Sequence, residues 1–295
     1  MDGTRKSRLK DIVDWVAHKS EKKDLPQSNT YWIYGLPGIG KTSLAHSICA
    51  SLHDQGQLAG AFFCRRDDPN LSEPRNILPS LIYKLARNLP PFRSTVANCL
   101  RNDPNLTSES MKDSFLLGLL DNLPKRPNNS LVFVIDAFDE CGSNRSRPPL
   151  LKLLTSAAAR ASWLKIIITS RPETDIRRFF DGLTQSSYLE CDLATDQEAS
   201  HDLRSAARSE FDPVGQKWCL SAPWPEEPLL DKIISQANGL FIFIKTLALA
   251  LENCEDPTES LQAASEDSAG AGLEALYRLY SSILNSRIVH RKAEF

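Results

Sequence analysis

The stretch GLPGIGKT, Gly35 to Thr42, decides the fold of this chain. It follows the short apolar run Tyr31 to Tyr34, and it precedes apolar residues at helical spacing: Leu44, Ala45, Ile48, Cys49 and Leu52. Its glycines let the backbone curl until successive N–H groups point at a phosphate, and the helix that follows adds its positive dipole end there. The pattern therefore predicts a strand, a phosphate-binding loop and a helix.

This loop also predicts which residues hold a nucleoside triphosphate. Lys41 is expected to reach the β- and γ-phosphates, and Thr42 to supply a hydroxyl ligand for Mg²⁺. The residues expected to contact the nucleotide are Gly35, Leu36, Pro37, Gly38, Ile39, Gly40, Lys41, Thr42 and Ser43. No Asn-Lys-x-Asp segment that would read guanine is present, so ATP and GTP both stay open.

Composition excludes several classes of protein. The 35 basic and 37 acidic residues give a formal charge of -2, so no global field attracts nucleic acid or an anionic membrane. Seven cysteines without a CxxC pair favour reduced thiols. The start lacks the apolar core of a signal peptide, and the longest apolar stretch, Leu240 to Leu251, is too short to span a bilayer. We expect a cytoplasmic protein without a membrane segment.

Four further apolar runs predict strands of the same sheet. They are Ala59–Cys64, Leu131–Ile135, Leu164–Thr169 and Tyr188–Cys191. Runs that are continuously apolar, rather than alternating, are typical of strands covered by helices on both faces. We therefore predict an α/β fold with a doubly wound, mostly parallel, five-stranded P-loop NTPase sheet. From Thr195 onward the pattern becomes helical, which predicts a small all-α domain with helices at Glu198–Glu210, Pro228–Ala237 and Leu240–Glu252.

The expected domain organisation follows from these patterns. Residues 1–28 hold a lead-in helix and a linker, 29–194 the nucleotide-binding core, 195–264 the helical domain, and 265–295 a last helix near Leu273–Leu284 and a polar tail from Arg287. Pro79 lies among the apolar residues of a further helix, where a proline is expected only in the first turn.

A second motif is LVFVIDAFDE, Leu131 to Glu140, whose strand ends at Asp136. Magnesium beside a phosphate loop needs a carboxylate at a strand end, and Asp136 fits that place. Hydrolysis also needs an acid that orients and deprotonates water, and Asp139 and Glu140 are the two candidates. The alternative is that these acids only cap the next helix or face solvent.

A third motif is KIIITSRPE, Lys165 to Glu173, in which Arg171 follows a buried strand. Ligands of open α/β sheets bind outside the carboxyl ends of the strands, so Arg171 is expected on the same edge as the phosphate loop. There it would sense the γ-phosphate and stabilise charge that moves to the leaving group. The alternative is an ordinary surface ion pair.

Together the three motifs resemble the NACHT family, which are signal-transducing P-loop NTPases of the STAND class. The specific mark is the small residue Ala137 after the magnesium aspartate, with acids at Asp139 and Glu140. AAA+ relatives place the catalytic glutamate directly after that aspartate. Three further segments look like fungal members: Ile77–Leu81, Ala237–Phe241 and Leu276–Tyr280.

The resemblance implies a molecular switch that oligomerises with itself or with other NACHT or effector proteins when triphosphate is bound. In fungal members such switches act in non-self recognition, a form of innate immunity, and in cell death. Against the plan of that family, we expect this sequence to lack an N-terminal effector domain and a C-terminal repeat sensor, and to stop about where a winged-helix domain begins in relatives. We therefore expect a fragment or a shortened relative.

The sequence thus predicts a magnesium-dependent nucleoside triphosphatase with slow turnover. Asp139, Glu140 and Arg171 would carry the chemistry, and Thr42 and Asp136 would hold the metal. Two alternatives remain. One is a nucleotide-binding oligomerisation scaffold without hydrolysis, and the other is a P-loop phosphotransferase, for which the sequence offers neither an acceptor pocket nor a basic lid.

Overall fold

The computed structural model describes residues 5–17, 28–102, 119–121, 127, 129–195, 199–266 and 270–293. They divide into two compact units. One comprises Ser7–Leu36 and Lys41–Leu193, and the other comprises Met1–Lys6, Pro37–Gly40 and Ala194–Phe295. We call them the sheet unit and the helical unit.

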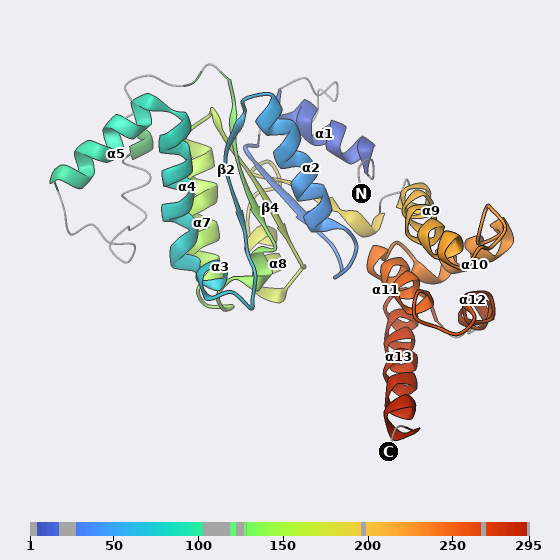
Figure 1. Cartoon of the computed structure of the whole chain (residues 1–295). Helices are drawn as coiled ribbons and strands as arrows, with labels where there is room; N and C mark the ends of the chain where they lie inside the picture. Colours follow the sequence, from blue (N-terminus) through green and yellow to red (C-terminus); the bar gives the residue numbers. More distant parts are fainter. Residues whose placement is uncertain are drawn as a thin grey trace. The chain divides into compact units, whose positions relative to one another are not determined.

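Within its described residues, the sheet unit is built on five parallel strands, as predicted (Figure 1). The strands are β1 (Thr30–Tyr34), β2 (Leu58–Phe63), β3 (Leu131–Asp136), β4 (Leu164–Ser170) and β5 (Leu189–Asp192). Their order across the sheet is β2-β3-β4-β1-β5. The strand before the phosphate loop therefore pairs with β4 rather than with β3, in a register that sets Tyr34 opposite Ser170.

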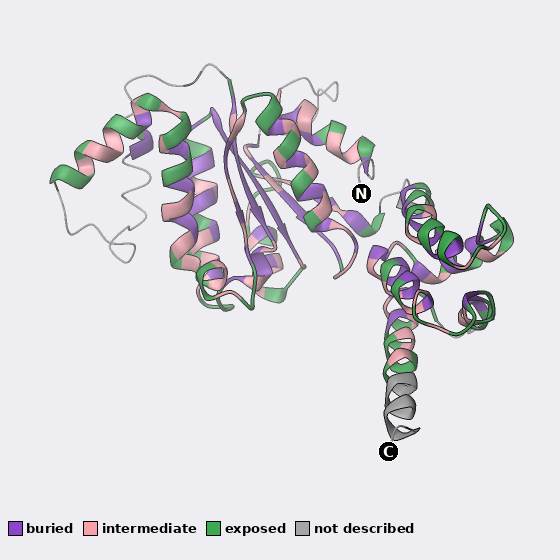
Figure 2. Cartoon of the chain, viewed as in Figure 1, coloured by how far each residue is buried: buried purple, intermediate pink, exposed green. Residues whose placement is uncertain are grey.

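Helices cover both faces of this sheet. In Figure 1, α4 (Pro74–Asn88) and α7 (Arg147–Arg160) lie on one side, and α2 (Lys41–Asp54) lies on the other. The remaining helices of the unit are α1 (Lys6–Val16), α3 (Pro69–Ser72), α5 (Pro90–Asn102) and α8 (Thr174–Asp181), with the 3₁₀ turn η1 (Phe138–Glu140) after β3. Figure 2 shows the strands buried, which is why their apolar runs do not alternate.

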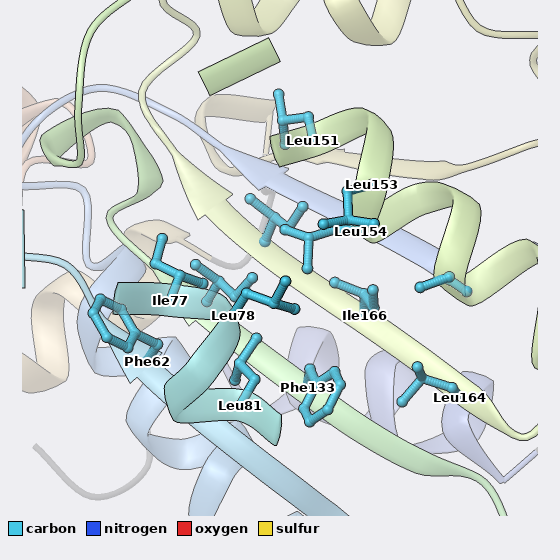
Figure 3. Packing of buried hydrophobic residues seen from close by; sticks show 14 of the residues in the cluster. Phe62, Ile77, Leu78, Leu81, Phe133, Leu151, Leu153, Leu154, Leu164 and Ile166 are labelled. Atoms are coloured by element: carbon cyan, nitrogen blue, oxygen red, sulfur yellow. The ribbon is translucent and has the colours of Figure 1, made fainter. Parts of the chain in front are cut away.

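The main core lies between the sheet and the α4–α7 layer. Figure 3 shows Leu78 and Leu81 of α4 and Leu154 of α7 packed against Phe133 of β3 and Ile166 of β4. All five side chains are buried. This packing holds β3 and β4 side by side, so the two segments that follow them leave the sheet at the same edge.

The turn η2 (Leu193–Thr195) spans the boundary between the units. The helical unit contains α9 (Ala199–Lys217), α10 (Glu227–Ala237), α11 (Phe241–Leu251), α12 (Pro257–Glu266) and α13 (Leu273–Ala293). Its core includes α11, in which Phe243, Ile244 and Leu247 are buried, and α9, in which Phe211 and Val214 are buried. This all-α unit follows the sheet as predicted.

Three local predictions were wrong. Pro79 lies in the second turn of α4, where burial of Ile77, Leu78, Leu81, Ile82 and Leu85 on the same helix outweighs the lost backbone hydrogen bond. Helix α12 was not predicted because its residues are mostly small and polar, with few apolar side chains to mark a face. Helix α13 continues to Ala293, so the expected polar tail from Arg287 is helical. The expected linker within 1–28 falls largely outside the described residues.

Candidate active site

The phosphate loop joins the end of β1 at Tyr34 to the start of α2 at Lys41. Gly38 and Gly40 adopt φ values of 77° and 95°, a left-handed region that side chains rarely enter. Glycine is therefore required at both positions for the loop to keep this curl. The loop ends in the first turn of α2, where unsatisfied N–H groups and the helix dipole favour an anion.

Lys41 is held at the base of this loop. Its ammonium donates hydrogen bonds to the carbonyl oxygens of Gly35 and Leu36, at 2.7 and 2.9 Å. Burial lowers the pKa of Lys41 to about 8, and the nearby carboxylates, of which Asp139 acts most strongly, oppose that change. The charge of Lys41 is thus coupled to the acids that follow β3.

Asp136, at the end of β3, is buried and has hydroxyl groups beside it. The hydroxyl of Thr169 in β4 donates to Asp136 Oδ1, and the Thr42 hydroxyl lies close enough to favour the charged carboxylate. Burial raises the pKa of Asp136, and the two hydroxyl groups act in the opposite direction. The predicted metal ligands Thr42 and Asp136 are therefore neighbours. Thr169 was not predicted as a site residue, although it belongs to the quoted Thr-Ser-Arg-Pro segment.

Ala137 turns the chain away from the sheet immediately after Asp136. It has φ 53° and ψ 43°, a left-handed conformation that is unfavourable for a residue with a Cβ. Its N–H donates to Thr169 Oγ1 at 3.0 Å, which helps to hold the turn. Such backbone strain persists only where surrounding contacts enforce it, and it is frequent at functional sites. Here it presents Asp139 and Glu140 in the short turn η1.

Asp139 and Glu140 differ in their surroundings. Asp139 is 4% exposed, and its carboxylate accepts the Arg171 N–H at 2.9 Å and pairs with Arg171 Nε at 3.3 Å. The side chain of Glu140 is 29% exposed and lies 4.0 Å from Arg171 Nη2. Glu140 also accepts the Arg66 N–H at 3.2 Å. Both predicted acids therefore meet Arg171, but only Glu140 keeps a solvent-accessible carboxylate.

A further buried arginine anchors the same turn and was not predicted. Arg147, the first residue of α7, donates to the Asp139 carbonyl at 2.7 Å. It also binds both carboxylate oxygens of Asp175 in α8. One sequence signal could have identified Arg147. A cation in the first turn of a helix interacts unfavourably with the helix dipole, which indicates that its side chain has another role.

A family model covers this site. The model described as "Nephrocystin 3, N-terminal" matches residues 10–171, more than half of the chain, from α1 through the phosphate loop to Arg171. The chain belongs to this family. A comparison with curated proteins gave no match.

Solved structures resemble this member of the nephrocystin 3 N-terminal family to different degrees. A Walker-type ATPase of Pyrococcus abyssi, paby2304, aligns with a TM-score of 0.50 and 14% identity over 98% of this chain and 75% of that chain. Drosophila ORC bound to DNA aligns with a TM-score of 0.44 and 16% identity, over 87% of this chain and 62% of that chain. C. elegans PCH-2 aligns with a TM-score of 0.42 and 15% identity, over 98% of this chain and 71% of that chain. The Pyrococcus structure supports a P-loop ATPase fold for this chain.

The structure also bears on membrane insertion. Among the residues that it describes, no helix combines the length and apolarity needed to cross a bilayer.

Proposed function

We propose that this chain binds a nucleoside triphosphate with Mg²⁺ and hydrolyses it. One observation carries the proposal: Arg171 pairs with Asp139 and Glu140 at the edge of the sheet where β3 and β4 end, and the charges of these residues and of Asp136 act on Lys41. Each comes from a segment that begins or ends at this edge, namely α2, β3 with η1, and β4. Phosphate binding, metal binding and water activation require these residue types together.

The residues at the end of β3 fit a magnesium ion. Thr42 and Asp136 offer hard oxygen donors at neighbouring positions, and burial of Asp136 favours a compensating cation. No group of three or more His, Cys, Asp or Glu in the described part of the chain could hold a metal by itself. Phosphate oxygens and water would therefore complete the shell, as is usual for Mg²⁺. The ion would neutralise charge that develops on the phosphates.

The phosphate loop would bind the nucleotide through its backbone and through Lys41. The ammonium donates to two loop carbonyls in this structure, and phosphate oxygens are stronger acceptors because they are charged. Residues 35–43 are the proposed contact segment. Arg171 would contact the γ-phosphate, since its side chain is 36% exposed although it pairs with Asp139.

We assign the water-activating role to Glu140 and a positioning role to Asp139. Both oxygens of Asp139 are engaged by Arg171, and the group is buried, so it has little capacity to accept a proton from water. Glu140 is accessible, and the Arg66 N–H fixes its orientation. A base must reach the water that it deprotonates, which favours Glu140.

Single-turnover hydrolysis beside equilibrium binding tests this assignment. Glu140→Gln should bind Mg-ATP or Mg-GTP about as tightly as wild type, yet hydrolyse it about 10²-fold more slowly, because general-base catalysis acts only in the transition state. Asp139→Asn should weaken the preference for triphosphate over diphosphate as well, because Arg171 loses its anchor. Glu73→Gln, at an exposed acid paired with Arg75, is the matched control.

Two outcomes would favour the alternatives. A wild-type protein that binds nucleotide but releases no phosphate would be a scaffold, and phosphate transfer to a small-molecule acceptor would indicate a phosphotransferase. Hydrolysis by Glu140→Gln at the wild-type rate would contradict the role of Glu140.

The resemblance to NACHT proteins supports a finer proposal, that hydrolysis resets a slow signalling switch, as in fungal immune signalling. Such a switch would oligomerise with a non-hydrolysable triphosphate analogue and not with diphosphate. Light scattering after size-exclusion chromatography measures the molar mass with each nucleotide. Lys41→Ala is the control, because without nucleotide binding its mass should not change. An equal wild-type mass with both nucleotides would contradict the proposed switch.

A further inference from the structure

Arg147 occupies a position that helix formation does not explain. It is the first residue of α7, where its charge opposes the helix dipole, and its side chain is only 11% exposed. Burial of an arginine is costly unless its donors are satisfied. The hydrogen-bond partners of Arg147 should therefore indicate its role.

The guanidinium divides its donors between two partners. Nε and Nη2 bind the two carboxylate oxygens of Asp175 at 2.8 and 3.0 Å, a bidentate pair that fixes the plane of the group. Asp175 lies in the first turn of α8, where an acid suits the dipole. Nη1 is thereby aimed at the Asp139 carbonyl, 2.7 Å away and buried.

Asp139 is thus held from both ends. Its carbonyl accepts from Arg147, and its carboxylate accepts from the backbone and side chain of Arg171. It sits two residues after Ala137, whose left-handed backbone needs enforcement by its surroundings. A brace on the Asp139 carbonyl would supply part of that enforcement.

We propose that Arg147 is a positioning residue for nucleotide recognition and hydrolysis. Oriented by Asp175, it fixes the backbone of Asp139, so that Asp139 can hold Arg171 at the γ-phosphate and Glu140 toward the attacking water. This inference rests on the proposed function of the site. Stability alone is a weak reason for the pair, since a buried ion pair gains little over apolar residues of similar size.

The chemistry of arginine is essential to this role. A lysine at 147 would keep the charge but has a single ammonium, which cannot form the bidentate pair with Asp175 and also bind the Asp139 carbonyl in a fixed plane. We therefore expect the preference for the triphosphate analogue and the hydrolysis rate to be highest in wild type, lower in Arg147→Lys and lowest in Arg147→Met. If the role of Arg147 were purely electrostatic, Arg147→Lys would have the wild-type preference and rate.

The test measures binding and chemistry separately on the whole chain. Fluorescence titration gives dissociation constants for the Mg²⁺ complexes of the nucleoside diphosphate and of its β,γ-imido triphosphate analogue. In Arg147→Met, the preference for the analogue should fall by about fivefold or more, as expected for coupling through Arg171. The single-turnover hydrolysis rate should fall by about tenfold, with diphosphate affinity within about twofold of wild type.

The matched control lies at the other end of the same helix. Arg160 ends α7 and pairs with Asp121 on the surface, away from η1. Arg160→Met should leave the analogue preference and the hydrolysis rate unchanged. If Arg147→Met does not fold, Arg147→Lys and Asp175→Asn take its place. The first removes Nη1 but keeps the positive charge, and the second keeps Nη1 but weakens the pair that orients it.

The outcomes distinguish this inference from the proposed function. Wild-type preference and rate in a folded Arg147 variant would overturn the positioning role even if its melting temperature fell. A wild-type protein that binds both nucleotides without releasing phosphate would overturn hydrolysis, while the analogue preference would still report on Arg147. A wild-type protein that binds neither nucleotide would overturn both.

Discussion

Lys165 gives a prediction about stability that can be worked from its surroundings. It lies in β4, is 1% exposed, and points its ammonium at α1, where Nζ donates to the Trp15 carbonyl at 3.1 Å. The same atom sits 4.1 Å from the centre of the Trp15 ring. Burial lowers the pKa of Lys165 to about 8. We expect Lys165→Met to be more stable than wild type at pH 7.

The magnitude follows from the pKa difference between folded and unfolded chains. An ordinary lysine titrates near 10.4, and each pKa unit corresponds to about 1.4 kcal/mol, so burying the charge costs about 3 kcal/mol below pH 8. Lys165→Met also leaves the buried Trp15 carbonyl without its donor, which costs about 1–2 kcal/mol. The expected net gain for Lys165→Met is therefore about 1–2 kcal/mol at pH 7.

Whether stability rises or falls with pH depends on whether the folded or the unfolded chain binds the Lys165 proton more tightly. Between pH 8 and about 10.4 the unfolded chain binds the Lys165 proton more tightly than the folded chain, so this group makes wild-type stability rise with pH. Below pH 8 the cost is fully present. The advantage of Lys165→Met should consequently shrink across this window as the folded wild type becomes neutral at this position.

Urea unfolding under reducing conditions at several pH values between 7 and 10 measures the difference between the two proteins. Other titrating groups affect both proteins equally, so the difference isolates Lys165. Lys152→Met, at an exposed position on α7, is the control and should show no such trend. A variant less stable than wild type at pH 7, or a difference independent of pH, would refute the reasoning.

Two further predictions concern the phosphate loop and the turn after η1. Mg-nucleotide at about 100 times its dissociation constant adds roughly 2.7 kcal/mol and should raise the melting temperature by several degrees, as scanning calorimetry can measure. Lys41→Ala should lose that increase while the melting temperature without nucleotide stays near wild type, and an unchanged increase would remove Lys41 from the site. Gly142→Ala should destabilise by about 2 kcal/mol or more, because φ is +63° and a Cβ would lie 2.4 Å from Pro74 Cγ. Gly56→Ala, with φ +65° and open space, should lose only about 1 kcal/mol, and equal losses in denaturant unfolding would show that the contact with Pro74 is not tight.

Local pattern predicted the strands and the phosphate loop because their signals lie within a few residues. A continuous apolar run marks a strand buried on both faces, and the glycines of Gly35–Thr42 mark a curl that side chains resist. Pattern failed where energies from distant contacts override local preference. Pro79 stands inside α4 because that helix buries five apolar side chains against the sheet.

The sequence by itself determined that Asp136, Asp139, Glu140 and Arg171 follow two strands of one parallel sheet. It could not determine that β4 lies between β1 and β3, because strand order depends on pairing between residues more than a hundred positions apart. Nor could the sequence distinguish the role of Asp139 from that of Glu140. Only the tertiary structure buries Asp139 against Arg171 and leaves Glu140 accessible, and only it brings Arg147 to the Asp139 carbonyl, because burial and hydrogen bonding arise where separate segments meet.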